Sequence, residues 1–568
     1  MKFKDMPYSR PDIKEVQATA EDITKRLSEA KTFEEADKLF DEFQDLLANV
    51  QTELTLAFVR HSIDTKDEFY KAESDFSDEV SPQLSEFVQN ASLALFNSPH
   101  RPKFEKKYGK ILFTNIELML KSFSPEIIPD MQEENKLSTE YDRLIASAQI
   151  DFEGEQYTLS QLSPFKQVPD DEKRLKAWQA DGGFYTENGQ KLDEIYDSLV
   201  KIRDRMAKKL GYKNYVELGY YRMERNCYSA TDVEKFRNAV VKYIVPIATE
   251  LYKEQAKRTN LPYPLSFSDM ALAFRSGNPK PAGGPDDILA HGKKFYHELS
   301  KETTAFIDFM YENELLDVLS RKGKSGGGYC TDIPKYKSQF IFANFNGTQH
   351  DVEVMTHEAG HAYAAYVANI NNVPLFLSSP SIEACEVHSM SMEFFAWPWC
   401  EGFFGKDTDK YFNNHLAGAL QFLPYGSMVD HFQHIIYENP EYTPEQRHDT
   451  WRELLGVYMP WVKLDSEILF YGEGKGWQRQ SHIYERPFYY IDYCLAQTVA
   501  LGFWALMQQD QKDAWNRYQS YVNLAGTRTF VELVEAAGLD TPFGDVALKK
   551  VADEASAWLN RQDTSKLV

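Results

Sequence analysis

The stretch that most constrains the fold is MTHEAGHAYAAY, residues 355–366. His357 and His361 are four positions apart, and on an α-helix this separation puts both imidazoles on one face, about one turn apart. Two imidazoles so placed suit one zinc ion. Glu358 lies roughly 100° around the helix from His357, so it is a poor ligand but could accept a proton from a metal-bound water. The stretch therefore predicts a helix that carries a hydrolytic metal site.

The alternative interpretation is three polar residues on an ordinary helix. The chain has 13 histidines among 568 residues, so an H-E-x-x-H pattern is rare by chance. Small residues surround the pair and would let the helix pack closely, without bulky side chains over an ion: Ala359, Gly360, Ala362, Ala364 and Ala365. The pattern and its setting together favour zinc.

A catalytic zinc needs a third protein ligand and an open position. A second helix is expected soon after the first, in SIEACEVHSMSMEFFAW, with Pro380 in its first turn and Ser379 as its cap. This helix carries several acids. Glu386 and Glu393 are two turns apart on one face, as a ligand and an acid that orients a ligating histidine would be.

Spacing alone does not separate Glu386 from Glu383 as the third ligand. His388, on the same helix, could also compete. A solvated acidic face is the remaining alternative. Apolar residues on both sides of the acids disfavour it: Val387, Met390, Met392, Phe394 and Phe395.

Composition narrows the classes of protein that fit. A chain of 568 residues suggests two to four structural units or one large multi-lobed fold. The formal net charge of -23 disfavours nucleic acid and anionic membranes as partners. No signal-peptide core and no run of 18 apolar residues is seen, so no membrane helix is expected. Five scattered cysteines without a C-x-x-C pair predict a reducing, cytoplasmic location.

The pattern along the chain is mostly helical. Residues 11–98 repeat apolar side chains every three or four positions, and Thr32 is placed to cap one of these helices. QIDFEGEQYTL, residues 149–159, alternates and predicts a small hairpin that turns at Glu153 and Gly154. Prolines near 164–169 suggest a seam, which divides the chain into an N-terminal helical lobe, 1–165, and a catalytic region, 166–568. QFIFANF, residues 339–345, reads as a strand.

These motifs together resemble the thimet oligopeptidase and oligoendopeptidase F group of zinc metallopeptidases, the oligoendopeptidase F branch more closely. The resemblance spans roughly residues 170 to 550 and rests on HEAGHAY, on EVHSMSME at 386–393 and on HIYERPFYYIDY at 482–493. Members of the group place their third ligand 29 residues after the first histidine. Since 386 − 357 = 29, the resemblance implies Glu386 rather than Glu383.

The resemblance also implies a fold and an activity. The fold would be mainly α, an elongated multi-helical zincin body divided by a deep channel, with small β elements near the active site. One Zn²⁺ per chain would act on short unfolded peptides, with Glu358 as general base. Tyr493 is the best candidate to donate to the oxyanion, with His482 and Tyr490 in support. Tyr484 and Tyr489 are alternates.

Substrate contacts are expected near the predicted strand. As an edge strand, 339–345 could pair with an extended peptide through its main chain, with Ala343 and Asn344 as the contact points. Gly326, Gly327 and Gly328 could form a mobile loop that closes over the peptide. An ordinary surface turn is the alternative interpretation of these glycines.

Two other functions fit parts of the pattern. A related helical zinc carboxypeptidase or dipeptidase would share the histidine pair and a downstream glutamate, and Arg486 could hold a substrate carboxylate. A non-catalytic peptide-binding protein could keep the helix alone, but the intact Glu358 and Glu386 disfavour this. Nothing in the sequence indicates an oligomeric state.

Overall fold

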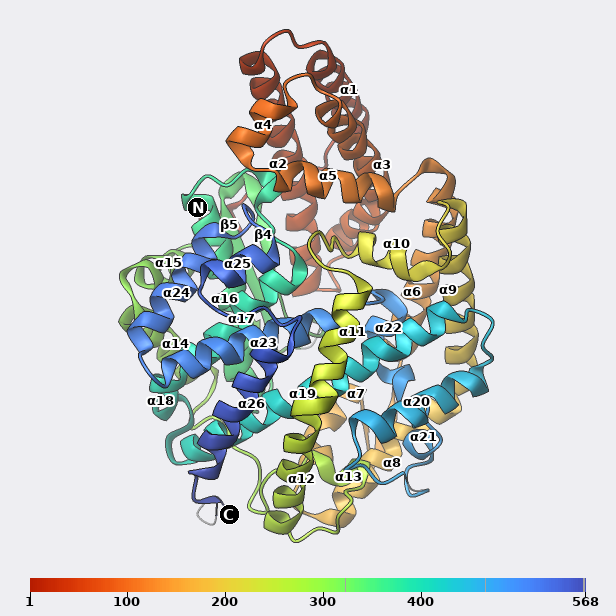
Figure 1. Ribbon diagram of the computed structural model, residues 1–568, viewed down its shortest axis with the longest axis vertical. Helices are drawn as coiled ribbons and strands as arrows, with labels where there is room; N and C mark the ends of the chain where they lie inside the picture. The colour runs from red at the N-terminus through yellow and green to blue at the C-terminus, as the bar shows by residue number, and fades with distance from the viewer. Residues whose placement is uncertain (322, 465, 565–566, 568) are drawn as a thin grey trace. The chain divides into compact units, whose positions relative to one another are not determined.

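The computed structural model describes residues 1–321, 323–464, 466–564 and 567, with the side chains of 78, 79 and 82 left aside. The described chain is mainly helical with two small sheets, which confirms the predicted fold class (Figure 1). It packs as two compact units, each built from three segments of the chain. The first unit comprises residues 1–120, 281–406 and 506–539, and the second comprises 121–280, 407–505 and 540–568.

The first unit contains the N-terminal helices, a three-stranded sheet and the helices that carry the H-E-x-x-H pattern. Its elements are α1 (Ile13–Glu29), α2 (Phe33–Ile63), α3 (Glu68–Phe96), α4 (Arg101–Tyr108), α5 (Ile111–Ser122), α14 (Pro285–Leu299), α15 (Lys301–Glu312), β3 (Leu316–Leu319), β4 (Tyr329–Ile333), β5 (Ser338–Phe345), α16 (His350–Ile370), α17 (Ile382–Phe395), α18 (Cys400–Phe404), α24 (Gln511–Leu524) and α25 (Phe530–Ala536).

The second unit is helical apart from one hairpin. Its elements are α6 (Ile128–Ala146), β1 (Ile150–Phe152), β2 (Glu155–Tyr157), α7 (Leu159–Leu162), α8 (Asp171–Glu187), α9 (Gly189–Lys209), α10 (Tyr215–Arg222), α11 (Ala230–Ala239), α12 (Val245–Thr259), α13 (Phe267–Met270), α19 (Thr408–Glu438), α20 (Pro444–Tyr458), α21 (Leu469–Gly472), α22 (Ser481–Glu485), α23 (Tyr490–Met507) and α26 (Asp545–Asn560).

Two local predictions are confirmed at the level of single residues. α1, α2 and α3 fill the region predicted as helical, and the Thr32 hydroxyl accepts the Glu35 N–H at 3.2 Å, as a capping residue does. β1 and β2 form the predicted hairpin, with Phe152 opposite Glu155. Glu153 and Gly154 make its turn with positive φ angles of 52° and 86°.

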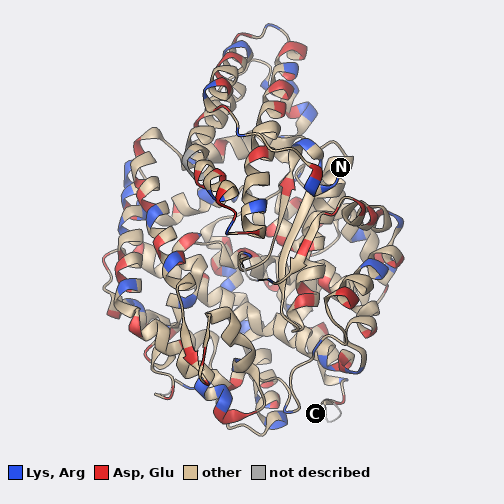
Figure 2. Cartoon of the chain, turned by 180° about the vertical axis from the view of Figure 1, so that it is seen from behind, with Lys and Arg blue, Asp and Glu red and all other residues tan. Residues whose placement is uncertain are grey.

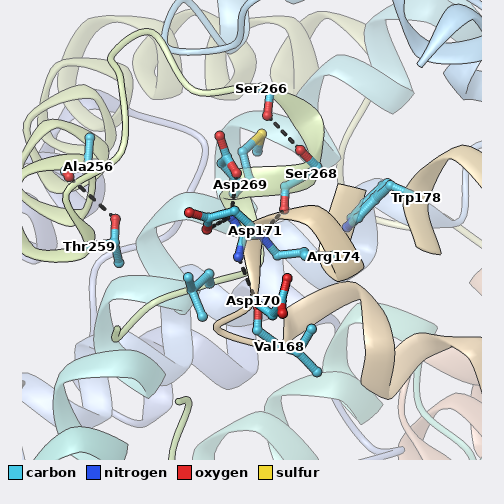
Figure 3. Close-up of polar contacts among 12 residues, drawn as sticks. Val168, Asp170, Asp171, Arg174, Trp178, Ala256, Thr259, Ser266, Ser268 and Asp269 are labelled. Carbon is cyan, nitrogen blue, oxygen red and sulfur yellow. Dashed lines mark hydrogen bonds and ion pairs between the residues drawn. The ribbon is translucent and has the colours of Figure 1, made fainter. Parts of the chain in front are cut away.

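The division at 165/166 is not the one into which the chain packs, because this point lies inside the second unit. The buried Arg174 guanidinium donates to the carbonyl oxygens of Val168 and Ser268, both at 2.9 Å, and pairs with Asp269 at 2.6 Å (Figure 3). These contacts join the predicted seam to residues about a hundred positions later. The prolines interrupt the helices there without interrupting the packing.

The three-stranded sheet has the order β3-β5-β4, with β5 parallel to β3 and antiparallel to β4. The prediction that residues 339–345 form an edge strand is therefore wrong. Seven of the eight β5 residues are buried, which fits a strand with neighbours on both sides and explains its continuous apolar run. The edge strands are β3 and β4. β4 packs against α16 and is paired with β5 alone among the described residues.

Charged residues of both signs are interspersed along the helices (Figure 2). Some form pairs one turn apart, such as Lys201 with Asp197 at 2.5 Å and Lys208 with Asp204 at 2.6 Å. Exposed pairs of this kind contribute at most about 1 kcal/mol each, so the buried apolar side chains dominate the stability of the helices. No helix in the described part of the chain is both long enough and apolar enough to span a bilayer.

Candidate metal centre

The centre forms where α16 and α17 pack side by side (Figure 1). Gly360 makes this contact possible. A β-carbon at that position would lie 2.7 Å from both the His388 carbonyl oxygen and the Ser389 α-carbon. Real β-carbons do not come so close to backbone atoms, so the two helices can approach to this distance only over a glycine. Gly360, one of the small residues predicted to allow close packing, thus has that role.

The structure brings the three predicted ligands together. Glu386 Oε2 lies 3.4 Å from His357 Nε2 and 3.5 Å from His361 Nε2. The side chains of the two histidines are 22% and 21% exposed, whereas Glu386 is 6% exposed. One ligand atom from each residue lies within 4.8 Å of the others. Two imidazoles and a carboxylate that reach one point, with access from solvent, fit the donor set of a catalytic zinc.

Neither alternative ligand joins this group. The buried Glu383 carboxylate accepts the Ser381 hydroxyl at 2.7 Å, and the buried His388 ring packs against Tyr521 with 5.4 Å between ring centroids. Among the described histidines, cysteines and acids, the group with metal-binding geometry is His357, His361 and Glu386.

The predicted start of the second helix is two residues too early. α17 begins at Ile382 with Ser381 as the preceding residue, rather than at Pro380 with Ser379 as cap. Ser381 is in an extended conformation, and its hydroxyl bonds the Glu383 carboxylate. This side-chain contact organises the entry into the helix, and a rule based on proline position does not take it into account.

Hydrogen bonds and neighbouring charges shift the pKa values of the candidate ligands. His357 Nδ1 lies 2.7 Å from Glu393 Oε1, as expected for an acid that orients a ligating histidine. Burial opposes protonation of His357, but Glu386 and Glu393 outweigh it and raise its pKa well above the usual value. Burial likewise penalises the Glu386 carboxylate, but the two imidazoles outweigh it and hold its pKa well below the usual range. The pocket therefore stabilises positive charge between these side chains, which a bound divalent cation would provide.

Two supports of the centre were not foreseen from the sequence. The Ser389 hydroxyl donates to Glu386 Oε2 at 3.1 Å and fixes the carboxylate. Two tyrosines of α24 donate to main-chain carbonyls of α17: Tyr518 to His388 at 2.8 Å and Tyr521 to Ala384 at 3.3 Å. The spacing of Glu386 and Ser389 could have suggested the first contact. The second joins segments about 130 residues apart and leaves no local signal.

We expect Gly360→Ala to destabilise the protein by about 1–3 kcal/mol, because the added methyl group meets backbone atoms that cannot rotate away. The midpoint of thermal or urea unfolding measures this. Gly418→Ala in α19 is the matched control, since nothing lies within 4 Å of the added carbon. The control should keep or slightly raise stability. Equal stability of both variants would contradict the packing role assigned to Gly360.

Glu358 follows His357 on α16 and is half-buried. It lies outside the group of ligand atoms. A carboxylate beside the ligands and not among them can act on protons there, which is the position predicted for a general base.

The predicted His/Tyr segment forms one aromatic group in the second unit. The ring centroid of His482 lies 5.0 Å from that of Tyr490 and 5.8 Å from that of Tyr493, and Tyr489 lies 4.9 Å from Tyr493. Gln480 contacts His482 Nδ1 at 2.9 Å. Phenol and imidazole groups thus gather at the start of α23.

Two other residues of this segment have different surroundings. Tyr484 is fully buried, stacks on Tyr141 with centroids 4.0 Å apart, and donates to the Leu192 carbonyl at 3.3 Å. These contacts assign it to packing. Arg486 is exposed to solvent.

A buried ion pair holds the same segment and was missed by sequence reasoning. Arg225 pairs with Asp492 at 2.9 Å and also donates to the Phe488 carbonyl. Phe488 has a φ of +70°, which is costly for an aromatic residue. Its N–H donates to Gln433 Oε1 at 2.9 Å. Since Arg225 and Asp492 are 267 positions apart, no local pattern could have paired them.

The residues expected to contact substrate make contacts within the protein instead. The Asn344 side chain donates to the carbonyls of Ser325 and Gly327, at 2.8 and 2.9 Å, so it holds the glycine-rich loop. Ala343 is buried on the central strand and its carbonyl accepts a bond from Lys324. Gly328 packs against the Phe342 carbonyl, where a β-carbon would lie at 3.3 Å. Ala343 and Asn344 are thus poor candidates for main-chain pairing with a peptide.

Comparison with known proteins places this geometry in a family. Residues 3–123 match the peptidase M3 N-terminal domain, and residues 293–553 match peptidase family M3. A candidate oligoendopeptidase F of known structure is 45% identical, with a TM-score of 0.95 and a match that covers 100% of both chains. The chain belongs to peptidase family M3. PZ peptidase A, solved with an inhibitor, is 46% identical to this M3 peptidase over 99% of its chain and 100% of the other, with a TM-score of 0.94.

A candidate oligoendopeptidase F from Bacillus anthracis strain Ames is 45% identical to the M3 peptidase, with a TM-score of 0.91 over 100% of this chain and 99% of that one. No match is found among curated proteins. The resemblance predicted from the motifs is confirmed, and it is wider than the span of 170 to 550, because the M3 N-terminal domain is also present. The enzyme is an M3 metallopeptidase.

Proposed function

We propose that this M3 metallopeptidase is a zinc-dependent endopeptidase that hydrolyses internal bonds of short unfolded peptides. The observation that carries the proposal is the group of His357, His361 and Glu386, with Glu358 beside it on α16. The likeness to oligoendopeptidase F structures supports short peptides as the substrates.

Each residue of the centre has a separate role in the proposed reaction. His357, His361 and Glu386 would hold the zinc, which when bound acts as a Lewis acid on water and on the scissile carbonyl. Glu358 accepts the proton of the attacking water and passes it to the leaving amine. Glu393 receives the Nδ1 hydrogen of His357, so that Nε2 is left as the ligand atom.

β4 takes the role that was expected of residues 339–345. It is one of the two edges of the sheet, and it packs against the helix that carries the proposed metal ligands. An extended peptide can add to such an edge through main-chain hydrogen bonds, which give affinity without demanding a particular sequence. Antiparallel addition is favoured, because antiparallel pairs are slightly more stable than parallel ones.

Tyr493 is proposed as the donor to the oxyanion, with His482 and Tyr490 as its neighbours. Tyr493→Phe should lower kcat by at least about tenfold and change KM little, because the hydroxyl acts mainly on the transition state. Steady-state kinetics on one peptide measure both constants. Tyr484→Phe is the control, since that hydroxyl bonds a buried carbonyl. An effect of Tyr493→Phe confined to KM would contradict the assignment.

An internally quenched peptide blocked at both ends tests the proposed reaction. An endopeptidase cleaves it, whereas a carboxypeptidase or dipeptidase needs a free terminus and leaves it intact. Removal of metal with a chelator should abolish cleavage, and stoichiometric Zn²⁺ should restore it. Cleavage that persists in the chelated enzyme would contradict the zinc-dependent mechanism.

A further inference from the structure

A cavity of about 460 Å³ lies in the first unit, beside the candidate metal centre. Its walls come from α2, from the carboxyl end of β4 with the turn that follows, and from the second half of α16. Three acids line it, Asp41 and Asp45 of α2 and Asp332 of β4. No role in the reaction described above accounts for it.

The cavity continues the face of α16 that carries the ligands. Its wall includes Ala365 and Asn369, which follow His361 by four and eight positions and so lie on the same side of the helix. At 1.5 Å per residue, the wall extends along the helix from about 6 to about 12 Å beyond His361. A substrate that reaches the metal ligands along this helix therefore passes the cavity.

The lining carries an excess of negative charge. Within the described part of the chain, Asp41, Asp45 and Asp332 form no ion pair with a lysine, arginine or histidine. One lysine, Lys337, lies on the lining, and its ammonium donates to Asn372 at 3.3 Å. Three acids and one base leave a formal charge of 1 − 3 = −2. All three acids are exposed on the wall of the cavity, where a cationic group of a ligand can reach them.

The spacing of these acids argues against a metal ion. Their oxygens do not converge to within 4.8 Å of one another, in contrast to the three metal-ligand side chains. Carboxylates spread along an open cavity suit an organic cation, an ammonium or a guanidinium, which is held by several acids at once.

We propose that this cavity binds a cationic group of the peptide on the N-terminal side of the cleaved bond. A peptide antiparallel to β4 has its N-terminal part at the carboxyl end of that strand, where Asp332 lies. At about 3.4 Å per residue, the cavity is two to four residues from the metal ligands. The cation is either the α-ammonium of a short peptide or a Lys or Arg side chain. The inference rests on the proposed function and adds a substrate preference to it.

Binding to the Glu358→Gln variant tests the preference separately from catalysis. The probes are N-acetylated neutral peptides, the same peptides with a free α-ammonium, and an N-acetylated set in which one lysine occupies each position in turn. We expect the free-amine or upstream-lysine peptides to bind about tenfold more tightly than the acetylated neutral peptide. Product analysis with the wild-type enzyme locates the cleaved bond, and the two kinds of cationic peptide show which source the cavity accepts.

The double variant Asp41→Asn, Asp45→Asn should reduce this ratio to within twofold and leave binding of the neutral peptide unchanged. The control Glu29→Gln, Glu34→Gln removes the same charge from exposed residues outside the cavity and should keep the ratio. Equal binding of cationic and neutral peptides, or a ratio that survives the double variant, would overturn the inference. Absence of hydrolysis by the wild-type enzyme would instead reject the proposed function, since these affinities do not depend on turnover.

Discussion

Replacement of Glu358 by glutamine should lower peptide hydrolysis by roughly 10²- to 10⁴-fold, the range that a general base contributes. The amide keeps the shape of the side chain but cannot accept the proton of the attacking water. Zinc content should stay at the wild-type level, because Glu358 is outside the group of metal ligands. Turnover of a quenched peptide and metal analysis on the same sample measure the two quantities.

Glu353→Gln is the matched control for this experiment. Glu353 lies on the same helix, bonds Gln349 at 2.9 Å and has no place among the ligands. Its variant should keep activity within about twofold, as most substitutions away from a site do. If Glu358→Gln keeps most of the activity, Glu358 is not the base.

Glu386→Ala should remove zinc from the enzyme and activity with it. Loss of an acid that only orients a ligand lowers metal affinity by about 10–100-fold, so loss of a ligand should exceed about 100-fold. Metal content by mass spectrometry after dialysis, together with a zinc titration, checks the result. The carboxylate is also the group that both imidazoles contact, so no neighbouring acid replaces it.

Glu383→Ala provides the comparison, because this acid is three residues away on the same helix and equally buried. Its loss leaves the Ser381 hydroxyl without its carboxylate, so stability should fall, by about 1–3 kcal/mol. The folded variant should still bind zinc. Zinc loss in Glu383→Ala with retention in Glu386→Ala would reverse the assignment of the third ligand.

The local parts of the fold and the site were predictable because their signals are local. Helical spacing places His357 and His361 on one face, and Thr32 caps its helix through a backbone N–H three residues away. The third candidate ligand could not be identified from helix spacing alone. Helix periodicity left Glu383 and Glu386 equivalent, and the separation of 29 residues implied by the family resemblance distinguished them.

The errors come from contacts between distant segments. β5 has the composition of any apolar strand, and its central position depends on β3, a strand of four residues whose sequence gives little warning. The seam near residue 165 has the prolines of a linker, yet Arg174 bonds it to Ser268 and Asp269. The tertiary fold determines the partner of a buried arginine. Neither its burial nor its partner can therefore be predicted from neighbouring residues.

The positions of these segments along the chain determine the order in which they are synthesised. α24 begins 150 residues after His361, since 511 − 361 = 150, and its tyrosines bond the main chain of α17. At translation rates of about 5–20 residues per second, α24 leaves the ribosome roughly 8–30 s after His361. During that interval α17 lacks these bonds, and we expect the nascent peptidase to be inactive.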